Sequence, residues 1–171
     1  AGDVGRDASL AVVDGRPAIA YFDETNDDLK YVWAGDTAGA TWGSRVIVDS
    51  VGDVGRDASL AVVGGRPAIA YRLNYDFTNG DLKYVRAGDA AGATWGIPVT
   101  VDSAGDVGYY ASLAVVNGCP AIAYYDITNH DLKYVWAGDA AGVTWDSSVT
   151  VDSAGDVGRD ASLAVVDGRP A

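Results

Sequence analysis

The sequence is poor in the side chains that most often carry chemistry. Its 171 residues include one cysteine, one histidine and no methionine, and Glu24 is the one glutamate. A single thiol excludes an intrachain disulfide and a zinc site built from cysteines. That thiol, Cys119, stands where the other copies of its motif carry arginine, so we interpret it as a drifted turn residue. We expect neither a metal nor another cofactor.

Basic residues are also scarce. The chain has 12 Lys and Arg residues against 24 Asp and Glu residues, a net charge of −12, and the acidic residues are spread along the whole sequence. A groove for nucleic acid needs a basic stripe, and anionic membrane surfaces attract basic segments. No hydrophobic run approaches the roughly 18 residues of a membrane-spanning helix. The sequence therefore predicts no nucleic-acid partner and no membrane partner.

What the sequence does have is a long internal repeat. The opening segment AGDVGRDASLAVVDGRPAIAY returns, with changes, at Val51, at Ala104 and, cut short, at Ala154. A period of about 50 residues is typical of an array of supersecondary units that bury their apolar faces against one another. The missing methionine and the interrupted last motif favour a fragment or a processed product. We divide the chain into repeats 1–50, 51–103 and 104–153, and a partial repeat 154–171 that holds a first strand and the start of a second.

Each repeat has the pattern of four short strands. In the first, the β-branched run 9–13 is followed by Asp14-Gly15, a strong signal for a type I′ hairpin, and then by a strand at 18–21. A polar loop leads to a third strand at 29–33, and another turn leads to a fourth at 41–48. The first two strands carry small apolar residues on both faces, so their sheet must lie between neighbours. We predict an all-β fold, a β-propeller of four-stranded antiparallel blades with about 50 residues per blade.

The turn between the third and fourth strands carries a recognisable motif. The segment 36–42, DTAGATW, recurs at 89–95 and 139–145. It resembles the Asp-box (BNR) repeat of sialidase-like β-propellers, Ser-x-Asp-x-Gly-x-Thr-Trp, with one residue inserted between Asp and Gly and alanine in place of the serine. The resemblance implies that the Asp caps backbone amides, that the Trp packs between blades, and that the motif is structural rather than catalytic. It also implies a secreted or cell-surface bacterial protein. The residues concerned are Asp36, Gly39, Thr41, Trp42, Asp89, Gly92, Thr94, Trp95, Asp139, Gly142, Thr144 and Trp145.

A ligand site is expected on the rim opposite the Asp-Gly hairpins, where the linker 2–8 and the loop 23–28 meet near a central channel. Three repeats enter their innermost strand with Arg-Asp, and the third enters it with Tyr-Tyr. A ring of Arg and Asp suits a carboxylate, a sugar or a peptide; the alternative is that Arg and Asp pair across neighbouring blades and only solubilise the rim. The tyrosine pair and the three added residues 72–74 favour a site at this rim. The candidates are Arg6, Asp7, Arg56, Asp57, Tyr109, Tyr110, Arg159 and Asp160.

The loops at 23–28, 76–81 and 126–131 share the pattern Asp-x-Thr-Asn-x-Asp. Clustered oxygens of this kind suit Ca²⁺. However, Asn and Asp are also preferred in turns because they bond their own backbone, and the pattern lacks a fixed glycine and a terminal bidentate acid. We favour turn chemistry and leave calcium as the alternative.

The sequence shows no catalytic set. His130 occupies a position held by Asp27 and Gly80 in the other repeats, which indicates a loop variant rather than a base. The sialidase resemblance would require an arginine triad, a Tyr–Glu pair and an acid from different blades, and near-identical repeats leave little room for such specialisation. We predict a non-enzymatic binding or scaffold module that contacts glycan or protein through one rim. The alternatives are a purely structural, recently amplified repeat and a degenerate sialidase-like glycosidase.

Three blades do not close a ring. Residues 1–18 and 154–171 are identical, so the two segments fit the same place in a blade. Head-to-tail contacts form closed rings when the rotation permits. We expect a homo-oligomer, a dimer that closes a propeller of six or seven blades.

Overall fold

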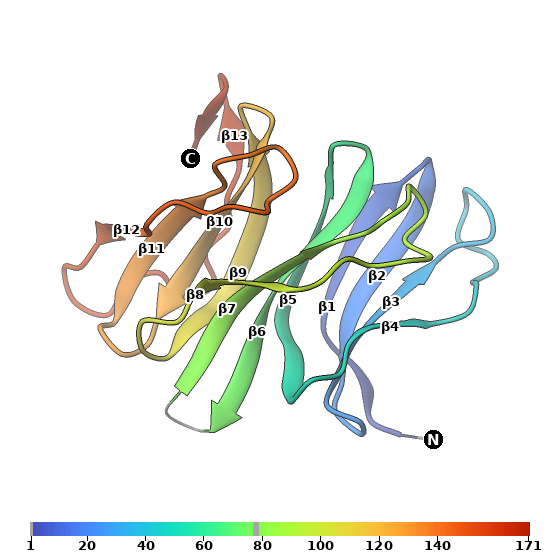
Figure 1. Ribbon diagram of the computed structural model, residues 1–171, viewed down its shortest axis with the longest axis horizontal. Coiled ribbons are helices and arrows are strands. Elements are labelled where there is room, and N and C mark those ends of the chain that lie inside the picture. Colours follow the sequence, from blue (N-terminus) through green and yellow to red (C-terminus); the bar gives the residue numbers. More distant parts are fainter. Residues whose placement is uncertain (1, 77–78) are drawn as a thin grey trace.

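Three antiparallel sheets of four strands each build the molecule (Figure 1). The computed structural model describes residues 2–76 and 79–171. Each sheet has its strands in chain order, and we call the sheets blades 1, 2 and 3. Blade 1 consists of β1 (Val4–Val13), β2 (Arg16–Asp23), β3 (Asp28–Trp33) and β4 (Val46–Asp49). Blade 2 consists of β5 (Asp53–Val63), β6 (Arg66–Asp76), β7 (Asn79–Arg86) and β8 (Val99–Asp102). Blade 3 consists of β9 (Val107–Val116), β10 (Cys119–Asp126), β11 (Asp131–Trp136) and β12 (Val149–Asp152). The partial repeat forms a short hairpin of β13 (Val165–Val166) and β14 (Arg169–Pro170).

The hairpins between the first two strands of each repeat confirm the predicted turn. Asp14 and Gly15 have φ values of 47° and 73°, and Asn117 and Gly118 have 50° and 83°. Positive φ at both central residues is what a type I′ turn requires, and its twist matches that of the flanking strands. The predicted all-β class and the blades of about 50 residues are confirmed.

Two predicted strand boundaries were wrong. The segment 2–8, expected as a linker, belongs mostly to β1, which begins at Val4 and shifts register twice before Ser9. These bulges let a strand with glycine and charged residues stay in the sheet. The fourth strand begins at Val46 rather than at residue 41, and an isolated bridge between Ala34 and Trp42 precedes it.

Adjacent blades pack face to face, and one apolar cluster fills each of the two spaces between them. Between blades 1 and 2 the cluster includes Leu29, Tyr31, Leu60, Ile69 and Tyr71. Burying each such side chain contributes about 1.5–3 kcal/mol relative to leaving it exposed. The second cluster repeats the same positions one blade further on, which is why near-identical sequences produce near-identical sheets.

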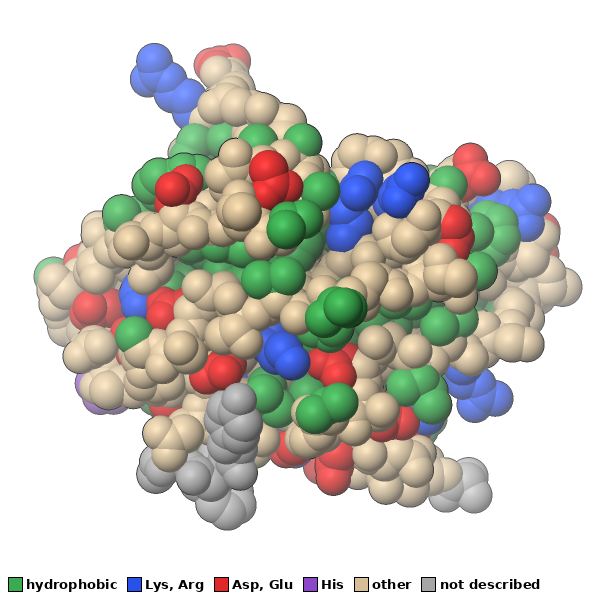
Figure 2. All heavy atoms as spheres, viewed as in Figure 1, with side chains coloured by type: hydrophobic (Ala, Val, Ile, Leu, Met, Phe, Trp, Pro, Cys, Tyr) green, Lys and Arg blue, Asp and Glu red, His purple; other side chains and the backbone are tan. Residues whose placement is uncertain are grey.

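Charged side chains of both signs are scattered over the visible face, and neither sign forms a large patch there (Figure 2). In the part of the chain that the structure describes, no helix is long and apolar enough to cross a membrane.

Candidate functional site

The bulges of the inner strands bring the same position of every repeat to one shallow cavity of about 320 Å³. Asp7, Asp57, Tyr110 and Asp160 all have φ between 50° and 52°, a left-handed conformation that non-glycine residues adopt infrequently. Hydrogen bonds from a backbone N–H to a side-chain carboxylate link these positions from blade to blade. The carboxylate of Asp7 accepts the N–H of Asp57 at 3.2 Å, and that of Asp57 accepts the N–H of Tyr110 at 3.0 Å. The acidic residues of the bulge therefore join neighbouring inner strands.

The arginines preceding the bulges do not pair across blades with these aspartates, contrary to the alternative considered for the rim. Each binds an acid three residues earlier in its own repeat. Arg56 Nε donates to Asp53 at 3.0 Å and Arg159 Nη2 donates to Asp156 at 2.8 Å. Arg6 follows the same rule with Asp3 at 3.5 Å and also reaches Glu24 at 2.8 Å.

A cation–aromatic pair closes each junction between blades beside this rim. The Arg56 guanidinium lies 4.5 Å from the centre of the Phe22 ring, and Arg159 lies 5.4 Å from that of Tyr125. Between blades 2 and 3 the roles are exchanged, because Arg72 occupies the aromatic position and lies 4.0 Å from the ring of Tyr109. Such contacts contribute about 0.5–2 kcal/mol, most when desolvated. Tyr109 therefore supplies the aromatic ring of this pair, at the position where the other repeats carry the arginine.

The exchanged arginine is buried. The side chain of Arg72 is 2% exposed, and it forms an ion pair with Asp106, whose side chain is 5% exposed. Among the described residues, Arg72 Nε finds no hydrogen-bond acceptor. A Cβ added to Gly80 would lie 2.5 to 2.6 Å from the guanidinium, so the absence of a side chain at residue 80 makes room for Arg72. The corresponding positions in the other blades are Asp27 and His130, and His130 Nδ1 lies 2.8 Å from the hydroxyl of Tyr125.

These features surround a cavity of about 340 Å³ between the blades. Arg72 and Asn74, two of the three residues that only repeat 2 carries, line it from β6. These added residues extend the hairpin of β6 and β7, with Asn74 opposite Gly80. Burial raises the pKa of the Asp57 carboxyl to about 6, and the nearby charge of Asp7 acts in the same direction. The lining residues are Asp7, Arg56, Asp57, Arg72, Asn74, Tyr109 and Tyr110.

The cavity gathers some of the predicted candidates and excludes others. Arg6, Arg159 and Asp160 lie outside it, while the other five predicted residues line it. Sequence reasoning noticed residues 72–74 as an insertion and missed that Arg72 faces Tyr109. An alignment of the repeats can reveal this contact, because an aromatic residue at one position goes with an arginine at the other and the two types exchange together. The pairs are Phe22 with Arg56, Arg72 with Tyr109, and Tyr125 with Arg159.

The Asp-containing turn lies at the opposite rim and has no contact with this cavity. Asp36 accepts the N–H groups of Ala38, Ala40 and Thr41 at 2.8 to 3.0 Å, and the equivalents Asp89 and Asp139 do the same. Hydrogen bonds to the threonine hydroxyl and to the backbone lower the pKa of Asp36 and Asp89 to about 2, and that of Asp139 further. Trp95 and Trp145 pack edge-on against Tyr31 and Tyr84 of the preceding blade.

The polar loops use their oxygens locally. Asp23 accepts hydrogen bonds from the backbone of Thr25 and the amide of Asn26, and Lys30 pairs with it; Asp126 is bonded by Asn129 in the same way. Phe77 and Thr78 of the second loop lie outside the described residues. Among all the residues that the structure describes, no three His, Cys, Asp or Glu side chains are placed to hold a metal ion.

No family model matches the chain, and no curated protein sequence matches it. Solved structures do match in fold. A thermostable family-43 glycoside hydrolase has 11% identity and a TM-score of 0.59, over 89% of this chain and 54% of that chain. A putative glycoside hydrolase from Parabacteroides distasonis has 14% identity and a TM-score of 0.57, over 89% and 54% of the two chains. The endo-arabinase from Bacteroides thetaiotaomicron has 13% identity and a TM-score of 0.58, over 98% and 62%.

This chain spans between about half and three fifths of the length of these structures. At such low identity the likeness concerns the fold. The chain therefore has the β-propeller architecture in three blades, with a distant structural likeness to propellers of glycoside hydrolases.

Proposed function

We propose that this protein is a non-enzymatic binding module that takes a short glycan in the 340 Å³ cavity between its blades. The observation that carries the proposal is Arg72, which lines the cavity, is almost fully buried and has an Nε donor without an acceptor among the described residues. A buried donor without a partner costs about 1–3 kcal/mol, and a ligand oxygen that reaches Nε after a small shift of the side chains around it would remove that cost.

The other lining groups suit sugar hydroxyls. Asp7 and Asp57 supply acceptors, Arg56 and Asn74 supply donors, and Tyr110 supplies an aromatic ring. A site with a few polar groups around a cavity of this size is the usual form of a small-molecule site. The glycoside hydrolases of similar fold make carbohydrate the first class of ligand to test.

The test is calorimetric titration of the protein with arabino-oligosaccharides and with a panel of other short glycans, including sialosides. Tyr110→Asn removes the ring while keeping a residue that tolerates positive φ. We expect this variant to weaken binding about tenfold or more, equivalent to about 1.4 kcal/mol.

The matched control is Asp160→Asn, which changes the same bulge position of the partial repeat outside the cavity, and we expect it to bind like the parent protein. Absence of binding across the panel would favour the purely structural repeat. Binding of a protein partner that Tyr110→Asn weakens equally would replace glycan by protein as the ligand class.

One observation favours a second candidate, glycoside hydrolysis. The pKa of Asp57 is raised to about 6 and Asp7 lies beside it, and glycosidases use two neighbouring carboxyl groups, one of which has a raised pKa and acts as the acid. We favour binding without hydrolysis because both carboxylates accept backbone N–H groups of the neighbouring inner strand. Hydrolysis of aryl arabinosides or sialosides that Asp57→Asn abolishes would establish the enzyme instead.

A further inference from the structure

Each of the two junctions between blades contains the same polar contact, made by an aspartate, a tyrosine and a lysine. The carboxylate Oδ2 of Asp49, at the end of blade 1, accepts the hydroxyl of Tyr71 at 2.6 Å and the ammonium of Lys83 at 3.3 Å, both from blade 2. One blade further on, Asp102 accepts the hydroxyl of Tyr124 and the ammonium of Lys133, the latter at 2.6 Å. The tyrosine, the lysine and the aspartate therefore form a repeated contact that fixes one blade on the next.

An aromatic contact repeats in the same way. Tyr31 meets Trp95 at 5.2 Å between ring centres and 67° between planes, and Tyr84 meets Trp145 at 5.2 Å and 65°. Each tyrosine hydroxyl also donates to a backbone carbonyl of the following blade, at 3.1 Å for Tyr31 and 3.3 Å for Tyr84. Edge-on aromatic pairs contribute about 0.5–1.5 kcal/mol beyond the area they bury.

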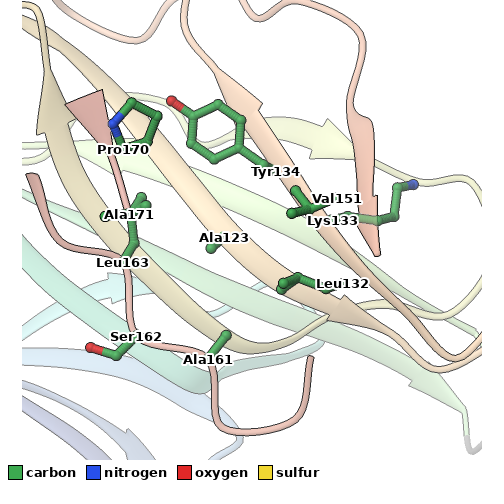
Figure 3. Close-up of a pocket in the computed structure, with 10 residues that line it drawn as sticks. All are labelled: Ala123, Leu132, Lys133, Tyr134, Val151, Ala161, Ser162, Leu163, Pro170 and Ala171. Atoms are coloured by element: carbon green, nitrogen blue, oxygen red, sulfur yellow. The ribbon is translucent and has the colours of Figure 1, made fainter. Parts of the chain in front are cut away.

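The outer face of blade 3 carries the aspartate of the polar contact and the tyrosine of the aromatic contact. Asp152, equivalent to Asp49 and Asp102, is exposed, and its Oδ1 caps the N–H of Ala154 as its equivalents cap theirs. No tyrosine or lysine of the described chain reaches its Oδ2. Tyr134, equivalent to Tyr31 and Tyr84, lines an apolar cavity of about 250 Å³ with Leu132 and Val151 (Figure 3).

The outer face of blade 1 carries the residue types that complete these two contacts at the other junctions. Tyr21, Lys30 and Trp42 occupy the positions of the tyrosine, lysine and tryptophan that reach back to a preceding blade. Tyr21 is 7% exposed, and Lys30 pairs with Asp23 on its own blade. The equivalent Lys133 likewise pairs with Asp126 of its own blade while it binds Asp102 of the preceding one. Leu10 on this face is 65% exposed, whereas its equivalents Leu60 and Leu113 are each 7% exposed because a blade covers them. Trp42 is 42% exposed.

The partial repeat already occupies the inner-strand place of a fourth blade. Ser9, Ser59 and Ser112 accept the N–H of the leucine in the following repeat, at 2.9 Å each time, and the third of these leucines is Leu163. Figure 3 shows Leu163 and Ala171 across the cavity from Leu132 and Tyr134 of blade 3. What this fourth place lacks in the described chain is the outer three strands.

We propose that β2, β3 and β4 of a second copy of this chain complete that place on the open face of blade 3. Tyr21 and Lys30 of the second copy then bind Asp152, and its Trp42 packs edge-on against Tyr134. The inner strand of the completed blade comes either from residues 1–18 of the second copy or from residues 154–171 of the first. The two segments are identical, so either one forms the same pairs with β2. The interface continues the two blade junctions already present, and two such contacts related by a twofold axis close a ring of six blades.

The test is the native mass of the chain by light scattering over a range of concentrations. We expect the mass of two chains for the parent protein and of one chain for Asp152→Lys, which faces Lys30 with a like charge. Thr100→Lys adds a positive charge at an exposed position of the middle blade, and we expect it to leave the mass of two chains.

Trp42→Ala provides a second route that changes no charge and leaves the strands of blade 1 intact; we expect it to shift the particle toward a single chain, with an unchanged circular dichroism spectrum. A single-chain mass of the parent protein at every concentration overturns the proposal. A two-chain mass that neither Asp152→Lys nor Trp42→Ala reduces also overturns it. If the parent protein forms a particle larger than two chains and both variants dissociate it, the contact between copies is supported, but the copies form an open array instead of a closed ring. None of these outcomes depends on glycan binding.

Discussion

The junction between blades 1 and 2 and the junction between blades 2 and 3 have similar sequences and differ in the placement of one arginine and its aromatic partner. In the first, Arg56 lies on Phe22 and keeps an ion pair with Asp53 in which both side chains are partly exposed, at 31% and 23%. In the second, the arginine has moved to the opposite strand as Arg72, and its ion pair with Asp106 is buried, at 2% and 5%. The two junctions therefore make the same kinds of contact in different dielectric surroundings.

This difference separates structure from candidate function. A solvent-screened pair contributes about 0–1 kcal/mol, whereas a buried pair is costly to form and more costly to break. The inverted junction therefore has an energetic cost that the ordinary one lacks. It also borders the cavity and contains the Nε of Arg72, which has no acceptor among the residues that the structure describes. A departure from the repeat that introduces a buried charge is the kind of departure expected at a binding site.

Removing the arginine of each junction gives the largest expected contrast. Arg72→Ala leaves Asp106 buried without its cation, and we expect the free energy of unfolding to fall by about 3–5 kcal/mol. The matched change Arg56→Ala leaves Asp53 partly exposed and should cost about 1 kcal/mol. Chemical denaturation of both variants measures the contrast, and equal losses would show that burial of the ion pair does not distinguish the junctions.

Converting one junction into the other tests the inversion itself. Tyr109→Arg alone brings a second guanidinium against Arg72, and we expect a loss of about 2 kcal/mol. Adding Arg72→Phe recreates the arrangement of Phe22, Arg56 and Asp53, because Asp106 precedes residue 109 by the same three positions. The double-mutant cycle should therefore give a favourable coupling of about 1 kcal/mol or more. Additive losses in urea denaturation would contradict the exchange of roles.

Gly80 tests whether Arg72 needs the space beside it. Gly80→Ala places a Cβ against the guanidinium, and we expect a loss of about 1–2 kcal/mol because a buried side chain must move. The same change in an Arg72→Ala background should cost nothing further, since the opposing atoms are gone. Thermal denaturation of the four proteins measures this, and an equal cost in both backgrounds would place the constraint in the backbone.

The sequence predicts the repeated parts of this molecule well and the exceptional parts poorly. The strands, the Asp-Gly hairpins and the stacked sheets follow from local patterns that occur several times, so each copy supports the others. The segment 2–8 is predicted as a linker, whereas in the structure most of it belongs to β1, with two register shifts and a positive φ at Asp7. The site depends on contacts between blades, such as Arg72 with Tyr109, and short-range patterns do not contain them.

The smallest expected effect concerns pH and the bulge of blade 2. The pKa of Asp57 is raised to about 6 in the folded protein, so folding favours its protonated form. Its stabilising contribution is present below the ordinary carboxyl pKa of about 4 and is lost as pH rises through 6. Asp57 is partly exposed, so we expect a difference of only about 1 kcal/mol.

Comparison with Asp57→Asn isolates this contribution, because asparagine keeps the shape of the neutral acid. Between about pH 4.5 and 7.5, the parent protein should lose stability relative to the variant by that amount. The turn carboxylates Asp36 and Asp89 do not obscure the effect, since their pKa of about 2 moves their contribution below this range. A difference between the two proteins that stays constant with pH would show that the bulge holds Asp57 as a carboxylate, and the acid required for glycoside hydrolysis would then be missing from the cavity.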